Sequence, residues 1–170
     1  MIRKPNKFSW PRKLYDKIRI GDEDKLVEEY GLKNKREIWK AESKIKYFRN
    51  RAKFLIGADS GDQEKFFTKL REIGLSVNTI AEVLALTKED LLKRRLATIV
   101  WKKGLANTAK HARQLIVHKK IFVGSRIINV PSYVVPISSE KEISLKSKAV
   151  PESSEKEISL KSKVQAEVIE

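Results

Sequence analysis

The sequence predicts an α+β fold in which a helical subdomain precedes a small module of two helices and an antiparallel sheet. Apolar residues recur every three or four positions through most of the chain, which is typical of helices with one buried face. Two short runs rich in β-branched residues flank Gly124-Ser125 and indicate a hairpin. We expect four segments: a basic arm at residues 1–21, the helical subdomain at 22–86, the module at 87–148 and a flexible tail at 149–170.

The helical subdomain contains the longest helical pattern. Asp22 can cap a first helix that ends at Gly31, and Asn34, with Glu37 three residues later, can start the long second one. Within residues 35–57 one less polar stripe runs through positions 38, 41, 45, 48, 52 and 55. This spacing favours a helix packed inside the domain, with a coiled coil as the alternative. Two shorter helices are expected at residues 63–73, ending at Gly74, and at residues 79–84.

The module begins at a capping-box pattern formed by Thr87 and Asp90. The helix that follows is expected to end at Gly104, and Asn107 or Thr108 can cap the next one. The residues expected to face the core are Leu91, Leu92, Leu96, Ile99, Val100, Ala112, Leu115 and Ile116. Strands are expected at residues 119–123 and 126–130, with Pro131 ending the second.

The charge is strongly positive, with 37 Lys and Arg against 22 Asp and Glu and a net charge of +15. Residues 137–170 hold six Lys and seven Glu, so the whole surplus lies in residues 1–136. A surplus of this kind indicates a polyanionic partner, for which nucleic acid is the main interpretation. A membrane surface is the weaker alternative, because the chain has no lipidation motif and no apolar run of membrane-spanning length.

Cations along three parts of the chain are candidates for binding RNA phosphates. Arg94, Arg95 and Arg113 are the first choices, because the planar guanidinium group can hold a phosphate with two hydrogen bonds. On one ideal helix the adjacent Arg94 and Arg95 would point about 100° apart. The remaining candidates are Lys102, Lys103, Lys110, His118 and Lys119 in the module, Lys44, Lys46, Arg49, Arg51 and Lys53 on the long helix, and Arg3, Lys4, Arg12 and Lys13 in the arm.

The arm alternates these cations with Phe8 and Trp10 and is interrupted by Pro5 and Pro11. We expect an arm that is disordered in isolation and that orders against RNA, with its aromatic rings stacking on bases or sugars. The alternative is a terminus that makes no fixed contact.

Several kinds of chemistry are not predicted. The chain has no Cys, so disulfides, thiolate zinc sites and a Cys nucleophile are excluded. His111 and His118 are the only histidines and lie about 10.5 Å apart along a helix, too far to share a metal ion. The sequence shows no Gly-rich phosphate loop, no Ser-His-Asp set and no carboxylate pair in a plausible cleft. We therefore expect no enzyme activity, cofactor, metal or small-molecule substrate, and, without a signal peptide, a cytoplasmic protein.

Five sequence motifs resemble a known family. They are Arg94-Arg95-Leu96, ARQLIVH at residues 112–118, IFV at 121–123, VPSY at 130–133 and YGLKNKREIWK at 30–40. The first four resemble the RNA-binding module of small-subunit ribosomal protein four, and the last is similar to the archaeal branch of that family. The resemblance covers roughly residues 8–145. Some bacterial relatives bind zinc through N-terminal cysteines, which this chain lacks.

The resemblance implies a structural constituent of the small ribosomal subunit. It implies direct binding to small-subunit rRNA at a helix junction of the 5′ domain, early in assembly, and contact with ribosomal protein five that influences translational accuracy. It also implies that His118 contacts RNA and that residues 142–145 add a third strand to the sheet. The alternatives are an assembly factor carrying the same module and, much more weakly, an rRNA-modifying enzyme such as a pseudouridine synthase.

The C-terminal tail contains an internal repeat. Residues 135–148 recur as residues 150–163, and only Ile137 differs, becoming Glu152. We expect the second copy to be a mobile tail. A further strand or a partner-binding segment is the alternative, because the copy keeps an alternating polar and apolar pattern.

Overall fold

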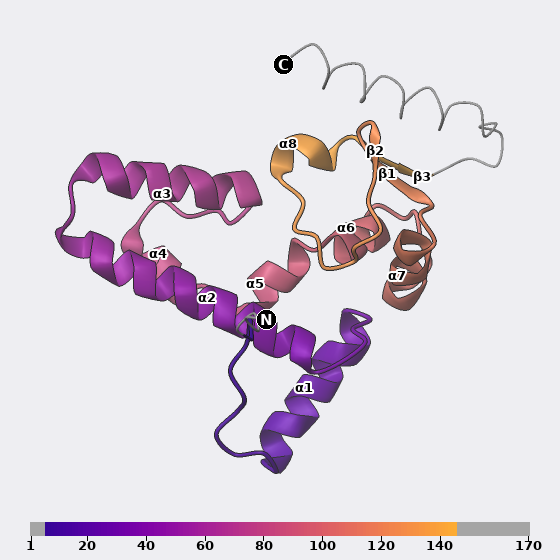
Figure 1. The fold of residues 1–170 in the computed structure, drawn as a ribbon, viewed down its shortest axis with the longest axis horizontal. Helices are drawn as coiled ribbons and strands as arrows, with labels where there is room; N and C mark the ends of the chain where they lie inside the picture. Colours follow the sequence, from indigo (N-terminus) through magenta and orange to yellow (C-terminus); the bar gives the residue numbers. More distant parts are fainter. Residues whose placement is uncertain (1–5, 146–170) are drawn as a thin grey trace, which may run out of the picture.

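Figure 1 shows the computed structural model, which describes residues 6–145. Its elements are α1 (Lys17–Glu29), α2 (Arg36–Phe54), η1 (Leu55–Gly57), α3 (Ser60–Ile73), α4 (Ile80–Ala85), α5 (Lys88–Lys93), α6 (Leu96–Lys102), α7 (Ala109–Val117), β1 (Ile121–Val123), β2 (Arg126–Ile127), α8 (Ile137–Glu140) and β3 (Ile143–Leu145). The predicted α+β fold is confirmed. The duplicated tail, Arg3 and Lys4 lie outside the described residues.

The long helix α2 forms the centre of the first hydrophobic core. The stripe predicted from its spacing is buried, with Ile38 and Ala52 fully so, and it packs against α4 and α5 of the same chain. Leu70, Val77, Val83 and Leu92 close this first core from α3, the following loop, α4 and α5. The interpretation of a helix packed within the domain is therefore confirmed, and the coiled-coil alternative is wrong.

A second core lies under the small sheet. Leu96 and Val100 of α6, Ala112 and Ile116 of α7 and Ile121 of β1 are all fully buried in it. The helices α6 and α7 pack on each other, and β1 and β3 cover them. The predicted inward face of both helices is thus confirmed.

The sheet has the strand order β2-β1-β3, with both pairs antiparallel. Phe122 of β1 lies opposite Ile127 of β2 and Ser144 of β3. The hairpin turn at Gly124 and the third strand implied by the family resemblance are both confirmed. The first two strands are shorter than predicted, at three and two residues.

Two predicted helix starts are wrong. Asp16, not Asp22, caps α1, because the Asp16 carboxylate accepts a hydrogen bond from the Ile18 backbone N–H at 3.2 Å. The helix therefore includes the last residues assigned to the arm. The second helix begins at Arg36 without a side-chain cap. Glu37 is expected to complete a cap with Asn34, but its carboxylate instead accepts hydrogen bonds from Arg113.

The expected helix from Thr87 to Gly104 is interrupted. Thr87 and Asp90 form the predicted capping box, but α5 ends at Lys93 and α6 starts at Leu96. Between them Arg95 is extended, and the backbone around it pairs with residues 133–135: the Leu96 N–H donates to the Tyr133 carbonyl at 2.8 Å and the Val135 N–H to the Arg94 carbonyl at 3.2 Å. Because backbone groups of residues 94 and 96 form hydrogen bonds with residues 133–135, one helix does not continue through Arg94 and Arg95.

Candidate nucleic-acid interface

Glu37 joins the two cores through two arginines. Its carboxylate accepts hydrogen bonds from Arg113 Nη2 at 2.8 Å and Nη1 at 3.2 Å, and from Arg95 Nη2. Arg95 is only 6% exposed. Burial raises the pKa of Glu37, but the hydrogen bonds and charges of Arg113 and Arg95 outweigh it and hold that pKa below its ordinary value. We call these three residues the Glu37 triad.

Arg94 connects α3 to the module. Its Nε donates to the Ile73 carbonyl at 3.0 Å, and its Nη2 donates to the Val135 carbonyl at 3.1 Å and to Glu140 Oε2 at 2.9 Å. Gly74 makes this crossing possible, because a Cβ there would lie 2.6 Å from the Arg94 Cζ. All three arginines chosen first for RNA binding are thus engaged inside the protein.

A pocket of about 650 Å³ opens between α2 and the segment that follows β2. Its lining includes Arg95 and Arg113 of the Glu37 triad, together with Lys7, Lys40, Ala41, Ser43, Lys44, Tyr47, Leu91, Leu92, Pro131, Ser132 and Val134. We call it the basic groove. Desolvation lowers the pKa of the Lys44 ammonium group, whose Nζ lies 5.8 Å from the centre of the Phe48 ring. Five cations against one carboxylate make the groove suited to an anion.

A second hollow, of about 600 Å³, lies between the end of α3, α6 and α8. Lys93, Lys102, Lys103 and Arg94 line it, opposed by Asp90 and Glu140. Lys103 also donates from Nζ to the Glu140 carbonyl. The predicted cations Lys102 and Lys103 therefore lie at this second hollow and not in the basic groove.

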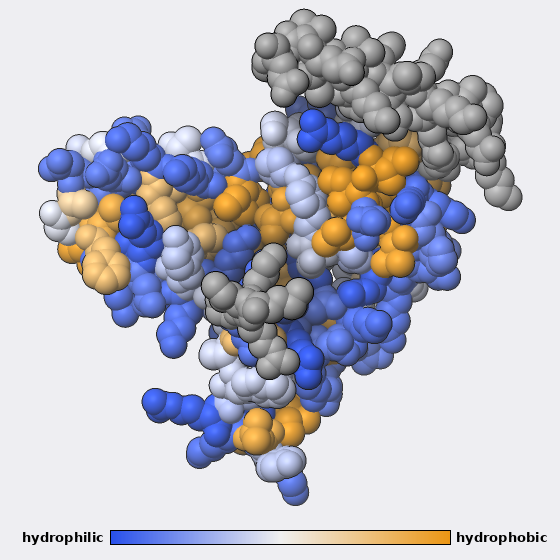
Figure 2. Space-filling model, in the orientation of Figure 1, coloured by the Kyte–Doolittle hydropathy of each residue, from blue (hydrophilic) through white to orange (hydrophobic). Residues whose placement is uncertain are grey.

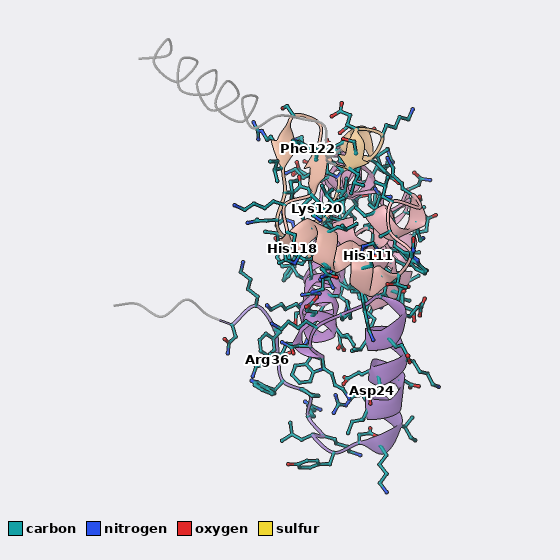
Figure 3. All side chains as sticks on the ribbon, turned by 90° about the vertical axis from the view of Figure 1, so that its right-hand side faces the viewer. Asp24, Arg36, His111, His118, Lys120 and Phe122 are labelled. Atoms are coloured by element: carbon teal, nitrogen blue, oxygen red, sulfur yellow. The ribbon has the colours of Figure 1, made fainter. Side chains whose placement is uncertain are left out.

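The exposed basic residues on α7 and directly after it form a third group. Thr108 caps the helix as expected, accepting from the His111 N–H at 3.1 Å, and Lys110, His118 and Lys119 are exposed. Figure 3 shows His111 and His118 at opposite ends of α7, with Lys120 beyond His118. Among residues 6–145, no group of three or more His, Asp or Glu side chains could hold a metal ion.

The arm from residue 6 onward is docked on α1 and α2. Phe8, Trp10 and Trp39 form an aromatic cluster with ring centres 5.3 to 5.9 Å apart. Glu23, 3% exposed, accepts from Trp39 Nε1 at 2.9 Å and from Arg19 Nη1 at 2.7 Å. The aromatic rings of the arm, which are expected to stack on bases or sugars of RNA, thus contact Trp39 of α2 in this structure.

The remaining candidates divide by exposure. Arg12 and Lys13 in the arm and Lys46, Arg51 and Lys53 on α2 are exposed. Arg49 instead donates from Nη2 to the Leu86 carbonyl at 2.6 Å and so attaches α2 to the end of α4. Figure 2 shows hydrophilic side chains over most of the visible face, with apolar patches between α2 and α3 and beside the small sheet.

Sequence reasoning missed the residues that assemble the groove. Glu37 was assigned to a helix cap, although the two arginines that it binds come 58 and 76 residues later. Lys7 and Lys40 were not among the chosen RNA ligands, and Glu23 and Glu140 were given no role. The one available signal was Glu37 itself, an acid inside the otherwise basic motif at residues 30–40.

Comparisons with known proteins place these features in one family. The S4 domain family matches residues 94–140, which run from the interrupted helix to α8. The small ribosomal subunit protein uS4 of Saccharolobus islandicus (strain L.S.2.15 / Lassen #1) is 42% identical over 144 residues, which cover 81% of this chain and 80% of the relative. The chain belongs to the small ribosomal subunit protein uS4 family.

A second archaeal relative agrees. The protein of the same name from Methanococcus aeolicus (strain ATCC BAA-1280 / DSM 17508 / OCM 812 / Nankai-3) is 46% identical over 133 residues, covering 74% of this chain and 75% of the relative. The resemblance to the archaeal branch is thereby confirmed. In residues 6–145 no helix combines the length and the apolar composition needed to cross a bilayer.

Proposed function

We propose that this protein is a structural, non-enzymatic constituent of the small ribosomal subunit in the cytoplasm and that it binds rRNA directly. The observation that carries the proposal is the basic groove, in which hydrogen bonds to Glu37 position the guanidinium groups of Arg95 and Arg113. A rigid set of cations binds phosphates well, because little side-chain ordering remains to be paid for on binding. Membership of the uS4 family supports the same role.

We propose further that the rRNA site is the helix junction of the 5′ domain, that binding there nucleates subunit assembly, and that a neighbouring protein, ribosomal protein five, shares an interface that influences accuracy. These statements rest on the family resemblance. Shape recognition fits the geometry, because the cations occur on three separated surfaces and not along one straight helix.

The roles of individual residues follow from their exposure. The residues that would contact phosphates are Lys7, Lys40 and Lys44 at the groove, Lys110 on α7 with His118 and Lys119 directly after it, and Lys102 and Lys103 at the second hollow. Arg113, with 23% of its side chain exposed, keeps one edge for RNA. Arg94, Arg95 and Arg49 act as positioning residues, because their guanidinium groups already bind the protein.

The test is a salt-titrated binding assay on the 5′-domain junction with an unrelated duplex as competitor. Specific binding should survive the competitor, and Lys40→Ala should lower the slope of log K against log salt by about one. Lys69→Ala is the matched control, since Lys69 is also exposed but lies on α3, outside both hollows. Equal affinity for both RNAs would contradict the proposal.

Stoichiometry separates this role from that of an assembly factor. A structural constituent remains at one copy in each mature subunit, whereas an assembly factor with the same module is absent from mature particles. Quantifying the chain in purified subunits decides between the two.

A further inference from the structure

The basic groove has two chemically different parts. Five cations line it together with apolar residues, of which Pro131 and Val134 are half-buried, whereas Ala41, Leu91 and Leu92 are buried. Tyr47 lines it too and is 66% exposed. Phosphate groups alone need only exposed cations, so the apolar part of the groove requires a different explanation.

The size and the charge of the groove narrow the choice of ligand. A volume of about 650 Å³ falls within the range of pockets that enclose a small organic molecule, about 300–1,000 Å³. The excess of cations requires that this molecule be anionic. A nucleotide meets both conditions, because its base is a flat, largely apolar ring system and its phosphate is an anion.

We infer that the basic groove receives one unstacked nucleotide of the bound RNA, with its base against the apolar lining and Tyr47 and its phosphate on the rim. This inference rests on the proposed function and deepens it. Proteins that recognise RNA by sequence commonly take bases out of loops and bulges and stack them on aromatic side chains. A fully paired helix offers no such base.

Individual residues of the groove divide the work. Lys40 and Lys44 of α2 hold the phosphate, because both line the groove and both side chains are exposed. Glu37 keeps Arg95 and Arg113 fixed at one wall, so the space for the base stays open. Tyr47 needs no rearrangement to contact a base, because its ring is already exposed.

Two RNA hairpins and one pair of variants test the inference. One hairpin carries a single bulged 2-aminopurine, and the other is identical but lacks the bulge. Tyr47→Ala removes the exposed ring without changing charge, and Phe54→Ala is its matched control, a ring 82% exposed on the same helix but outside the groove. A third variant, Ser132→Leu, fills the groove from an exposed rim position with a side chain that cannot stack.

We expect the bulged hairpin to bind wild type about tenfold more tightly than the paired one and to change its 2-aminopurine emission, since stacking of one base on an aromatic ring is worth about this factor or more. Tyr47→Ala and Ser132→Leu should abolish the preference and the emission change while leaving the salt slope unaltered. Phe54→Ala should behave as wild type. A shallower slope of log K against log salt in Tyr47→Ala would instead show that a cation has been displaced, and it would count against the inference.

Other results overturn it. If wild type binds the 5′-domain junction specifically but does not distinguish the two hairpins, the nucleotide site is wrong while the proposed function stands. If wild type binds no RNA more tightly than the competitor, the nucleotide site and the proposed function are both wrong. Adenosine monophosphate is the third probe: saturable binding at micromolar concentration that Tyr47→Ala abolishes, combined with no preference for the bulged hairpin, would assign the groove to a free nucleotide and refute the RNA assignment.

Discussion

Removing the charge of Glu37 should destabilise the whole molecule, because this carboxylate is the ionic link between its two cores. In Glu37→Gln the buried guanidinium of Arg95, 6% exposed, would keep its charge without a counter-ion. Breaking a buried pair by removing one partner costs about 3–5 kcal/mol. Because Arg113 retains 23% of its side-chain exposure and can regain water, we expect the low end, about 3 kcal/mol of unfolding free energy.

Urea denaturation followed by circular dichroism measures this loss. The midpoint should fall while the slope m stays unchanged, since the buried area does not alter. In a chain of this size the melting temperature should drop by roughly 6–12 °C. Glu42→Gln, an exposed substitution on the same helix, should stay within about 0.5 kcal/mol of wild type.

The reasoning can be refuted in two ways. A change below about 0.5 kcal/mol in Glu37→Gln would mean that the triad carries no net stability. Combining it with Arg95→Met removes the unpaired charge, so the double variant should be more stable than the sum of the two single losses predicts, by about 1 kcal/mol or more. Simple additivity would show that Glu37 and Arg95 do not interact.

Two further predictions concern pH and the backbone. The pKa of Glu37 is lowered in the folded protein, so its stabilising effect is complete above the ordinary value of 4.5 and is lost as the pH falls through the lowered value. The difference in unfolding free energy between wild type and Glu37→Gln should therefore shrink below about pH 4.5 in urea titrations. Gly74→Ala should lower the unfolding free energy by about 1–2 kcal/mol or more in the same assay, since Gly74 has φ +89° and an added Cβ would meet the Arg94 guanidinium. Gly21 lies inside α1 with open space around it, so Gly21→Ala should instead raise the unfolding free energy by about 0.5–1 kcal/mol.

Local patterns in the sequence were sufficient to predict the elements whose packing is local. The stripe on α2, the capping box at Thr87, the cap at Thr108 and the left-handed glycine at Gly104 all depend on residues within one or two helical turns. The cap of α1 was not predicted because Asp16 and Asp22 are equally good cap residues. The helix extends N-terminally from Asp22 to Lys17, where Arg19 contacts both Glu23 and the backbone of the arm.

The arginines show why the candidate site was harder to predict than the fold. A guanidinium group that binds phosphate and one that binds a carboxylate or a carbonyl have the same sequence signature, and the partner decides between the roles. The partners of Arg94 and Arg95 come from residues 73, 135, 140 and 37, so no local pattern reveals them. Charge composition therefore identifies the class of ligand, while tertiary contacts decide which cations remain available to bind it.

The positions of these buried arginines also explain how a basic protein can keep a rigid RNA-binding surface. Cations confined to one groove repel one another in the absence of RNA, and flexible lysines would move apart. Placing a single carboxylate behind Arg95 and Arg113 offsets part of that repulsion and fixes both side chains, while Lys7, Lys40 and Lys44 keep the groove positive overall. If the groove binds RNA as proposed, the acid at position 37 contributes by organising the cations around it, and we expect its loss to weaken RNA binding as well as stability.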